Sequence, residues 1–209
     1  SWNFGNGNNS NLQNPAAIYV NPGTYTVSLT VTGASGSDTE TKTAYITVYA
    51  NPTANLGTNQ NTTGCAPYTV GFQDLSSPGS GPINQWLWDF GDGTTSNLQN
   101  PSHTFFQPGN YTVSLFVTDV NGCTNTDTED ITVNPLPDAT ITAAGPFCVD
   151  DGAVNLTAAT AGGTWSGVGI TNATTGTFDP ATAGAGTHTI TYMVTDGNGC
   201  MNTDTKDIT

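Results

Sequence analysis

The sequence predicts an all-β protein made of tandem β-sandwich domains, and three observations support this prediction. Apolar and polar residues alternate over residues 86–90 and 111–118, which is the pattern of half-buried strands. A similar passage recurs along the chain, which is typical of an array of repeats. The 209 residues include 25 Gly and 12 Pro, and no stretch shows helical periodicity.

Residues 86–119 define the repeated passage, which consists of a strand, a tight turn, a loop and a second strand. Trp86, Trp88 and Phe90 fall on one face of the first strand, where we expect core positions. Asp and Gly residues supply the turn that ends this strand. The motif comprises Trp86, Trp88, Asp89, Phe90, Gly91, Asp92, Gly93 and, in the second strand, Tyr111.

Altered copies of this passage occur on both sides of it. The copy that lies 86 positions upstream retains Trp2 and Phe4, but Asn3 and Asn6 replace the two acids of the turn. The copy that lies 77 positions downstream shares only the closing strands and the Asp-x-Asn-Gly-Cys turn between them. The repeats predict three domains: residues 1–50, with the later strands only, residues 51–135 and residues 136–209.

We expect strands in this chain order: around Trp2, 25–32 and 43–48; then 69–72, 86–90 and 111–119; then 139–142, 154–157 and 187–195. The short Pro-containing links at 51–52 and 134–137 limit bending between neighbours, so an extended rod is predicted. The first domain lacks its opening strands, and we therefore expect the sequence to be a window on a longer repetitive protein.

The motif also resembles a known family. Trp-Asp-Phe-Gly-Asp-Gly, followed by Gly-x-Tyr-Thr-Val-x-Leu-x-Val-x-Asp, is similar to the PKD domain, an Ig-like β-sandwich. The resemblance covers almost all of residues 51–135, and residues 1–50 match as Trp-Asn-Phe-Gly-Asn-Gly. Residues 136–209 lack the motif and resemble more loosely the Ig-like repeats of large bacterial surface proteins. The resemblance implies tandem Ig-like sandwiches with core tryptophans.

The charge balance excludes some partners. The chain has 16 Asp and Glu against 2 Lys and Arg, which gives a net charge of −14. Such a chain repels nucleic acid and anionic lipid, because phosphate binding requires basic side chains. No apolar run is long enough to span a bilayer. We therefore expect neither nucleic acid as a partner nor direct membrane insertion.

Four cysteines occupy corresponding places in the second and third domains. We expect one disulfide within each domain, because the long spacings do not suit a zinc site. The expected pairs are Cys65 with Cys123 and Cys148 with Cys200. Free structural thiols are the alternative. Disulfides imply export to an oxidising compartment, so an extracellular or cell-surface location, on a bacterium, is predicted.

Two groups of carboxylates are candidates for calcium binding or catalysis. Asp89 and Asp92 are replaced by Asn in the first copy, which favours a turn role, because Asn keeps the turn hydrogen bonds. The calcium candidates near the predicted joints are Asp127, Glu129, Asp130, Asp150 and Asp151. Their spacing names no metal, and a solvated acidic strand edge explains the first three equally well. We predict no cofactor and leave calcium open.

The remaining candidates are histidines and one tryptophan. His103 is replaced by Ala17 in the first copy, and His188 stands where the other copies have Tyr. Both are therefore predicted to be structural, and no catalytic triad is expected. Trp165 lies among Gly and Ser and is considered for sugar stacking, although a core position on a middle strand is favoured.

These features predict a structural repeat segment, a stalk or filament, of a secreted or cell-surface protein. The Asn-Gly-Cys closing motif is similar to that of repetitive adhesins of gliding bacteria, so an adhesin is the expected context. The alternative is an accessory, carbohydrate-binding module of an extracellular hydrolase, since PKD domains also occur in secreted proteases and chitinases. No enzyme is expected within these residues. The expected partners are neighbouring repeats, other copies of the chain or surface glycans.

Overall fold

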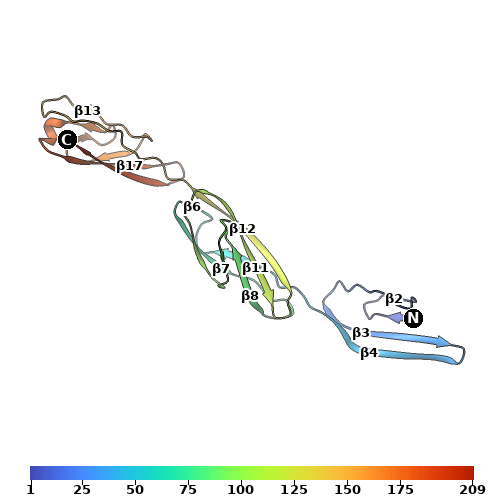
Figure 1. Ribbon diagram of the computed structural model, residues 1–209. Helices are drawn as coiled ribbons and strands as arrows, with labels where there is room; N and C mark the ends of the chain where they lie inside the picture. The colour runs from blue at the N-terminus through green and yellow to red at the C-terminus, as the bar shows by residue number, and fades with distance from the viewer. The chain divides into compact units, whose positions relative to one another are not determined.

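The computed structural model describes residues 1–209 and consists almost entirely of β-strands (Figure 1). The strands form five sheets, and the helix α1 (Pro180–Ala183) has four residues. None of the chain's helical structure is long and apolar enough to cross a membrane. The all-β prediction is therefore confirmed.

The first sheet lies within residues 1–48 and has the strand order β2-β1-β3-β4. Its strands are β1 (Trp2–Asn3), β2 (Asn9–Ser10), β3 (Gly23–Gly33) and β4 (Gly36–Val48). The two long strands are antiparallel neighbours, as Figure 1 shows. Phe4 is the buried apolar side chain of this region, whereas β4 is exposed along most of its length.

Two sheets follow, with the orders β10-β7-β5 and β6-β12-β11-β8-β9. Their strands are β5 (Leu56–Thr58), β6 (Thr63–Cys65), β7 (Tyr68–Asp74), β8 (Ile83–Asp89), β9 (Thr95–Ser96), β10 (Ser102–Phe105), β11 (Gly109–Asp119) and β12 (Thr124–Asn134). The ring centroid of Phe72 on β7 lies 5.5 Å from those of Trp88 and Phe90. The two sheets therefore face each other across an aromatic core.

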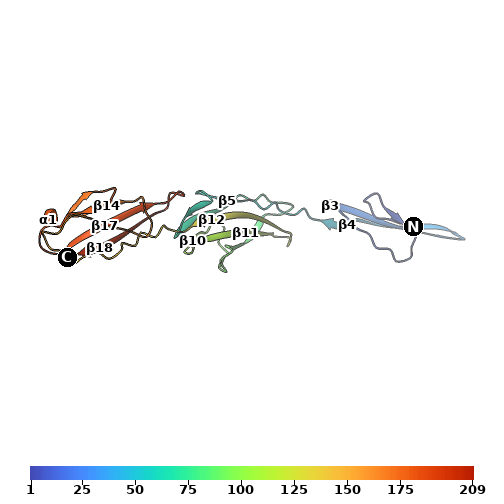
Figure 2. The ribbon, with the colours of Figure 1, turned by 90° about the horizontal axis from the view of Figure 1, so that it is seen from above.

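The last two sheets have the orders β13-β16-β15 and β14-β17-β18. Their strands are β13 (Val154–Asn155), β14 (Thr164–Ser166), β15 (Ile170–Asn172), β16 (Thr177–Phe178), β17 (His188–Thr195) and β18 (Met201–Ile208). Figure 2 labels the three strands of the second of these sheets. Ile190, Tyr192 and Val194 of β17 share one buried cluster with Trp165 and Phe178. A second sandwich core is thus formed by alternate residues of short strands.

Contacts between Cα atoms divide the chain into two compact units. One comprises residues 1–59, 71–101 and 112–129, and the other comprises residues 60–70, 102–111 and 130–209. These limits cut through β7, β11 and β12, so they do not follow the predicted limits after residues 50 and 135. The predicted domains remain a prediction, and we call residues 1–50, 51–135 and 136–209 the first, second and third repeats.

The alternation that predicted the strands matches the burial of their side chains. Trp88 is fully buried, as are Val113, Leu115 and Val117 on β11. The expected strand at 139–142 differs, because Ile141 makes only an isolated bridge, to Ala158. Parity thus predicted the buried face of β11 and the place of Trp88, whereas it did not show that residues 139–142 lack a paired strand.

The backbone of the turn after β8 lies close to β11. Gly91 and Gly93 both have positive φ, at 76° and 89°. A Cβ on Gly91 would lie 2.7 Å from the carbonyl oxygen of Thr112, whereas a Cβ on Gly93 would meet nothing within 4 Å. We expect Gly93→Ala to cost about 1 kcal/mol, the strain of a left-handed conformation alone. Gly91→Ala should cost about 2 kcal/mol more, because the strand behind it must move.

Urea unfolding of the two variants measures this difference. Equal losses of stability in Gly91→Ala and Gly93→Ala would contradict the close approach of the turn to β11.

Candidate functional site

The Asp/Asn turn of the repeated motif is held by the same hydrogen bond in both copies. Asp89 Oδ1 accepts a hydrogen bond from Gly91 N at 2.9 Å. In the first copy, Asn3 Oδ1 accepts one from Gly5 N at the same distance. An amide oxygen therefore serves as well as a carboxylate, because the turn uses only the acceptor. This equivalence supports a structural role for the acids of the motif.

An open hollow of about 520 Å³ lies beside Trp86 in the second repeat. Leu87 and Phe116 are register partners on β8 and β11 and are 44% and 38% exposed. Apolar surface beside a few polar groups is the usual composition of a small-molecule site. The residues that line the hollow are Asn84, Gln85, Trp86, Leu87, Asn97, Phe116 and Thr118.

Trp165 lies in the core, as favoured from the sequence, whereas Trp86 does not reach the core position expected for it. Trp86 shares the parity of Trp88 but is only half-buried, because its Nε1 donates a 2.6 Å hydrogen bond to Asp74 Oδ2 at the edge of the core. Trp165 is 5% exposed, and its ring centroid lies 4.4 Å from that of Tyr192. The favoured core position of Trp165 is therefore confirmed over the sugar-stacking alternative, and the accessible tryptophan surface lies at Trp86.

Asp74, the hydrogen-bond partner of Trp86, is a polar residue that sequence reasoning missed. Partial burial alone would raise the pKa of Asp74, but hydrogen bonds outweigh it and lower the pKa below its ordinary value of 3.8. The donors are the side chain and backbone of Ser76, the Gln99 amide and the Trp86 indole. No spacing in the sequence indicated that these residues, up to 25 positions apart, converge on one carboxylate.

His188 takes over a tyrosine's hydrogen bond. The Tyr111 hydroxyl donates to the carbonyl oxygen of Gln107, four residues earlier, at 2.8 Å. His188 Nε2 lies 2.9 Å from the carbonyl oxygen of Gly184, also four residues earlier. His103 packs edge-on against Phe105, with 4.7 Å between ring centroids. These contacts support structural roles for both histidines.

The calcium candidates do not converge. No group of three or more metal-ligating side chains is present in the chain. Asp127 Oδ2 accepts a hydrogen bond from Leu56 N at 2.9 Å, and at the corresponding place in the third repeat Asp204 Oδ2 accepts one. Asp151 Oδ2 instead caps Cys148 N at 2.7 Å. Asp127 thus holds the opening segment of the second repeat, and Asp151 closes a local turn. The others, Glu129, Asp130 and Asp150, join no metal-ligating group.

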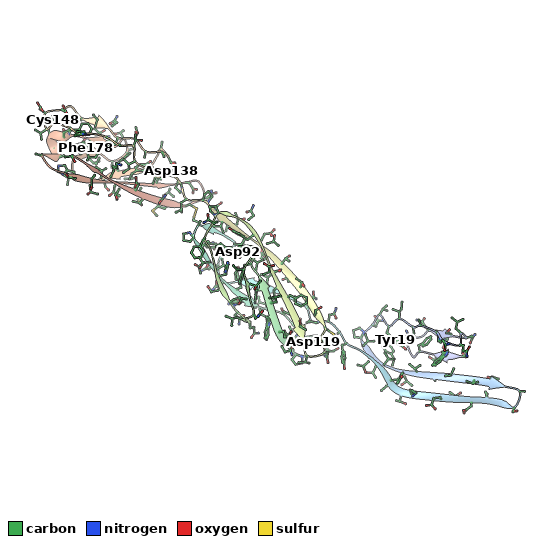
Figure 3. The ribbon with its side chains drawn as sticks, viewed as in Figure 1. Tyr19, Asp92, Asp119, Asp138, Cys148 and Phe178 are labelled. Atoms are coloured by element: carbon green, nitrogen blue, oxygen red, sulfur yellow. A yellow bond between two sulfur atoms is a disulfide. The ribbon has the colours of Figure 1, made fainter.

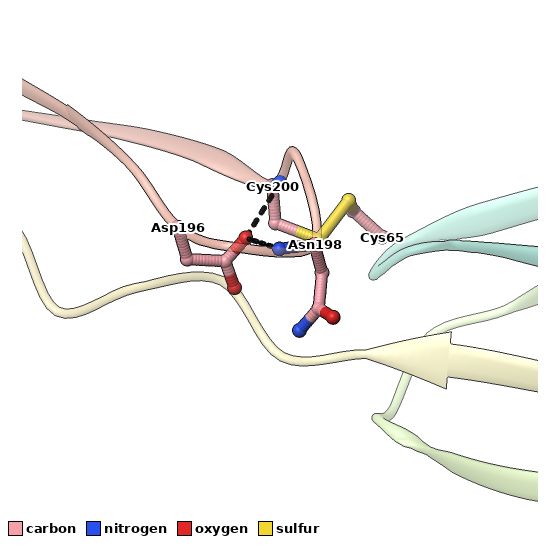
Figure 4. The surroundings of a disulfide bond; sticks show 4 residues. All are labelled: Cys65, Asp196, Asn198 and Cys200. Carbon is pink, nitrogen blue, oxygen red and sulfur yellow. Dashed lines mark hydrogen bonds between the residues drawn. A yellow bond between two sulfur atoms is a disulfide. The ribbon is translucent and has the colours of Figure 1, made fainter.

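The disulfide pairing differs from the prediction. Cys65 is bonded to Cys200, with 5.5 Å between their Cα atoms (Figure 4). Cys123 and Cys148 are free. The bond joins the second repeat to the third. Both expected pairs, each within one repeat, are therefore corrected.

The length of the closing strands explains this result. Cys200 directly precedes the first residue of β18. Cys148 lies near the other end of β18, because the backbone N–H of its neighbour Phe147 donates a hydrogen bond to Thr209, which follows the last residue of the strand. The eight residues of β18 span about 26 Å, and a disulfide requires Cα atoms within about 7 Å. The same holds for β12, which Cys123 precedes and whose last residue, Asn134, pairs with Cys65. Each repeat thus carries its two cysteines at opposite ends of one strand.

The turn before β18 presents Cys200 to its partner. Asp196 Oδ1 accepts hydrogen bonds from Asn198 N at 2.9 Å and Cys200 N at 2.8 Å (Figure 4). Two bonds to one carboxylate oxygen fix the backbone that carries the thiol. The Cys200 side chain itself is fully buried.

Comparison with known proteins places these features in context. The sequence model of the PKD domain matches residues 1–48 and 49–133. A microbial collagenase of Vibrio alginolyticus is 36% identical over 91 residues, which is 43% of this chain and 11% of that protein. Collagenase ColA of Bacillus cereus is 41% identical over 58 residues, which is 28% of this chain and 6% of that protein. The chain thus corresponds to about a tenth or less of these relatives.

Solved structures include similar domains. The PKD1 domain of the Vibrio cholerae metalloprotease PrtV is 33% identical, with a TM-score of 0.37, and the match covers 40% of this chain and 98% of that one. The PKD1 domain of Vibrio anguillarum Epp is also 33% identical, with a TM-score of 0.38, over 42% of this chain and 99% of that one.

The turn bonds predict how substitutions of Asp89 behave. Asp89→Asn should leave the free energy of unfolding within about 0.5 kcal/mol, because the acceptor for Gly91 N remains. Asp89→Ala should lower it by about 1 kcal/mol, because that N–H loses its partner. Equal losses for both variants in urea unfolding would show that the charge, and not the acceptor, matters.

The hydrogen bonds to Asp74 predict an acid-sensitive fold. Because the folded pKa lies below the unfolded one, the stabilisation is complete above about pH 4 and is lost as the pH falls through the folded pKa. Asp74→Asn should therefore lower Tm at pH 7 and flatten its decline between pH 5 and about pH 2. Thermal melts over this range measure both effects, and a variant with the full acid dependence of the parent would contradict this assignment.

Proposed function

The chain belongs to the PKD-domain family, and on this premise we propose that it is a structural repeat segment of an extracellular protein. The repeats share features that serve folding. These are side chains that accept hydrogen bonds in turns, strands with alternating apolar and polar residues, and the turns before the closing strands. The chemical groups vary between copies, since Asn3 stands for Asp89 and His188 for Tyr111. In this role the segment carries no catalytic centre of its own.

The observation that carries the proposal is the bond between Cys65 and Cys200, which lie 135 positions apart in different repeats. A load applied to the two ends of the chain passes through this bond and bypasses residues 66–199. A disulfide persists in an oxidising compartment, which supports an extracellular location.

The context that we propose is a stalk or filament of a bacterial cell-surface protein such as an adhesin. Neighbouring repeats are then its partners. The net charge of −14 supports this context, because it keeps long arrays soluble and apart from one another. The collagenases among the relatives support the extracellular setting.

A second candidate function is an accessory, carbohydrate-binding module of an extracellular hydrolase. The observation that favours it is the hollow of about 520 Å³ beside Trp86, with the exposed faces of Leu87 and Phe116. Its amide side chains, Asn84, Gln85 and Asn97, would provide the polar contacts that a sugar requires.

The structural proposal predicts how the chain extends under force. Pulling on both termini of the oxidised chain should give a contour length roughly 470 Å shorter than after reduction, because 135 residues at about 3.5 Å each are locked. Cys123→Ser should not change this length, since Cys123 is free. Two separate gains of roughly 200 Å and 180 Å, expected for bonds within each repeat, would contradict the proposal.

A glycan array separates the two candidate functions. The structural proposal predicts no saturable binding by the oxidised chain. Binding that Trp86→Ala weakens by roughly tenfold or more would support the accessory module instead. Val168→Ala, which changes an exposed apolar residue outside the hollow, is the matched control and should leave any binding unchanged.

A further inference from the structure

The bond between Cys65 and Cys200 has two different halves, and the chain contains each half twice. One half is the cysteine of an Asp-x-Asn-Gly-Cys turn, before the closing strand of a repeat. The other half is a cysteine beside the far end of that strand. One copy of each half is bonded, and one copy of each, Cys123 and Cys148, is free.

The free turn cysteine has the geometry of the bonded one. Asp119 Oδ1 accepts hydrogen bonds from Asn121 N at 2.9 Å and from Cys123 N at 2.8 Å. These partners and distances are those of the turn that presents Cys200. The backbone bond from Asp119 N to the Cys123 carbonyl, at 2.9 Å, also recurs between Asp196 and Cys200. The turn at Cys123 is therefore built to present a thiol in the same way.

The free strand-end cysteine also matches its bonded counterpart. Gly64, which precedes Cys65, pairs with the residue that follows Thr132 on β12. Phe147, which precedes Cys148, donates a 2.8 Å hydrogen bond to the carbonyl oxygen of Thr209. Thr209 corresponds to Thr132 at the repeat distance of 77 positions. Cys148 therefore occupies, in the third repeat, the place that Cys65 occupies in the second.

The surroundings of Cys148 leave room for a partner. Cys148 is exposed and borders a hollow of about 350 Å³ that is also lined by Phe147, Val149, Phe178 and Pro180. Val149 is 50% exposed. Figure 3 shows Cys148 beside Phe178, at the opposite end of the third repeat from Asp138. Asp150 and His188 also line this hollow, so the space next to the exposed thiol can take a polar turn that brings its own cysteine.

We propose that Cys148 forms a disulfide with the turn cysteine of a further repeat of the same type. The same rule assigns Cys123 to a strand-end cysteine of another repeat. This inference deepens the proposed structural function, on which it rests, by naming the partner of the segment: an Asp-x-Asn-Gly-Cys turn. Consecutive repeats of this type are then joined by a ladder of disulfides between repeats and none within them.

The bond forms by oxidation of two thiols. Each Sγ–H bond breaks and one Sγ–Sγ bond forms, so two protons and two electrons leave the protein. A small disulfide such as oxidised glutathione accepts them and becomes two thiols, through a mixed-disulfide intermediate. The thiolate of Cys148 is accessible for this exchange because its side chain is exposed.

An extended chain tests the proposal. Residues 133–209 are added after Thr209, which continues the 77-residue register, because Thr132 is followed by Val133. In the added copy Cys148→Ser leaves Cys200 as its only cysteine, and Met201→Leu marks the mass of its peptide. The chain is refolded with reduced and oxidised glutathione and alkylated. It is digested with pepsin at acid pH, because 2 Lys and Arg offer few tryptic sites.

The expected result is a link from Cys148 to the marked Cys200 in most chains, beside the Cys65–Cys200 link of the parent. Changing Cys148 to Ser in the original part should free the marked Cys200 and leave the parent link intact. Cys123→Ser should leave both links intact. Alkylated Cys148, or a marked peptide joined to another cysteine, in a chain whose far-ultraviolet β signal shows the added copy folded, overturns the proposal.

A second extended chain covers the case in which that copy does not fold. It adds residues 48–135 after Thr209, with Cys65→Ser, so that Cys123 is the only cysteine of the addition. A link from Cys148 to the added Cys123 supports the proposal, and its absence in the folded chain overturns it. The Cys65–Cys200 link of the parent tests the proposed function independently. Its absence would remove the main support for that function, whether or not Cys148 is linked to the added repeat.

Discussion

The structure depends on side-chain oxygens that stabilise turns by accepting hydrogen bonds from backbone N–H groups. Asp196 is the clearest case, since one of its oxygens binds the backbone nitrogens of both Asn198 and Cys200. With only 2 Lys and Arg in 209 residues, ion pairs cannot organise this chain. Short polar side chains that accept hydrogen bonds from nearby backbone N–H groups take the place of ion pairs. No buried side-chain nitrogen or oxygen lacks a hydrogen-bond partner. The position of the disulfide follows from this, because the turn decides where the thiol lies.

The same constraint explains the many acids in this protein. Asp127 and Asp204 each anchor an opening segment through a backbone N–H, in two different repeats. Side chains that are already used in this way are poor candidates for calcium ligands. The acidic composition is thus divided between local turn closure and a charged surface, and neither role requires a metal or a substrate.

The sequence predicted those features that depend on neighbours along the chain. Alternation placed Trp88 and Leu115 in the core, because side-chain direction along a strand has a period of two. It failed for Trp86, whose position is set by a hydrogen bond to Asp74, 12 residues away in the sequence and on another sheet. The predicted cysteine pairs were wrong. The cysteines occupy corresponding positions in the two repeats, but this correspondence does not show which cysteines lie close together in space. The available signal was the strand of eight or eleven residues between each turn cysteine and the end of its repeat.

The central claim is that covalent bonds run between repeats and not within them. Peptide mapping of the oxidised 209-residue chain, alkylated without reduction, tests it most directly. The account predicts one linked pair, Cys65 with Cys200, and alkylated Cys123 and Cys148. Linked pairs of Cys65 with Cys123 and of Cys148 with Cys200 would contradict it.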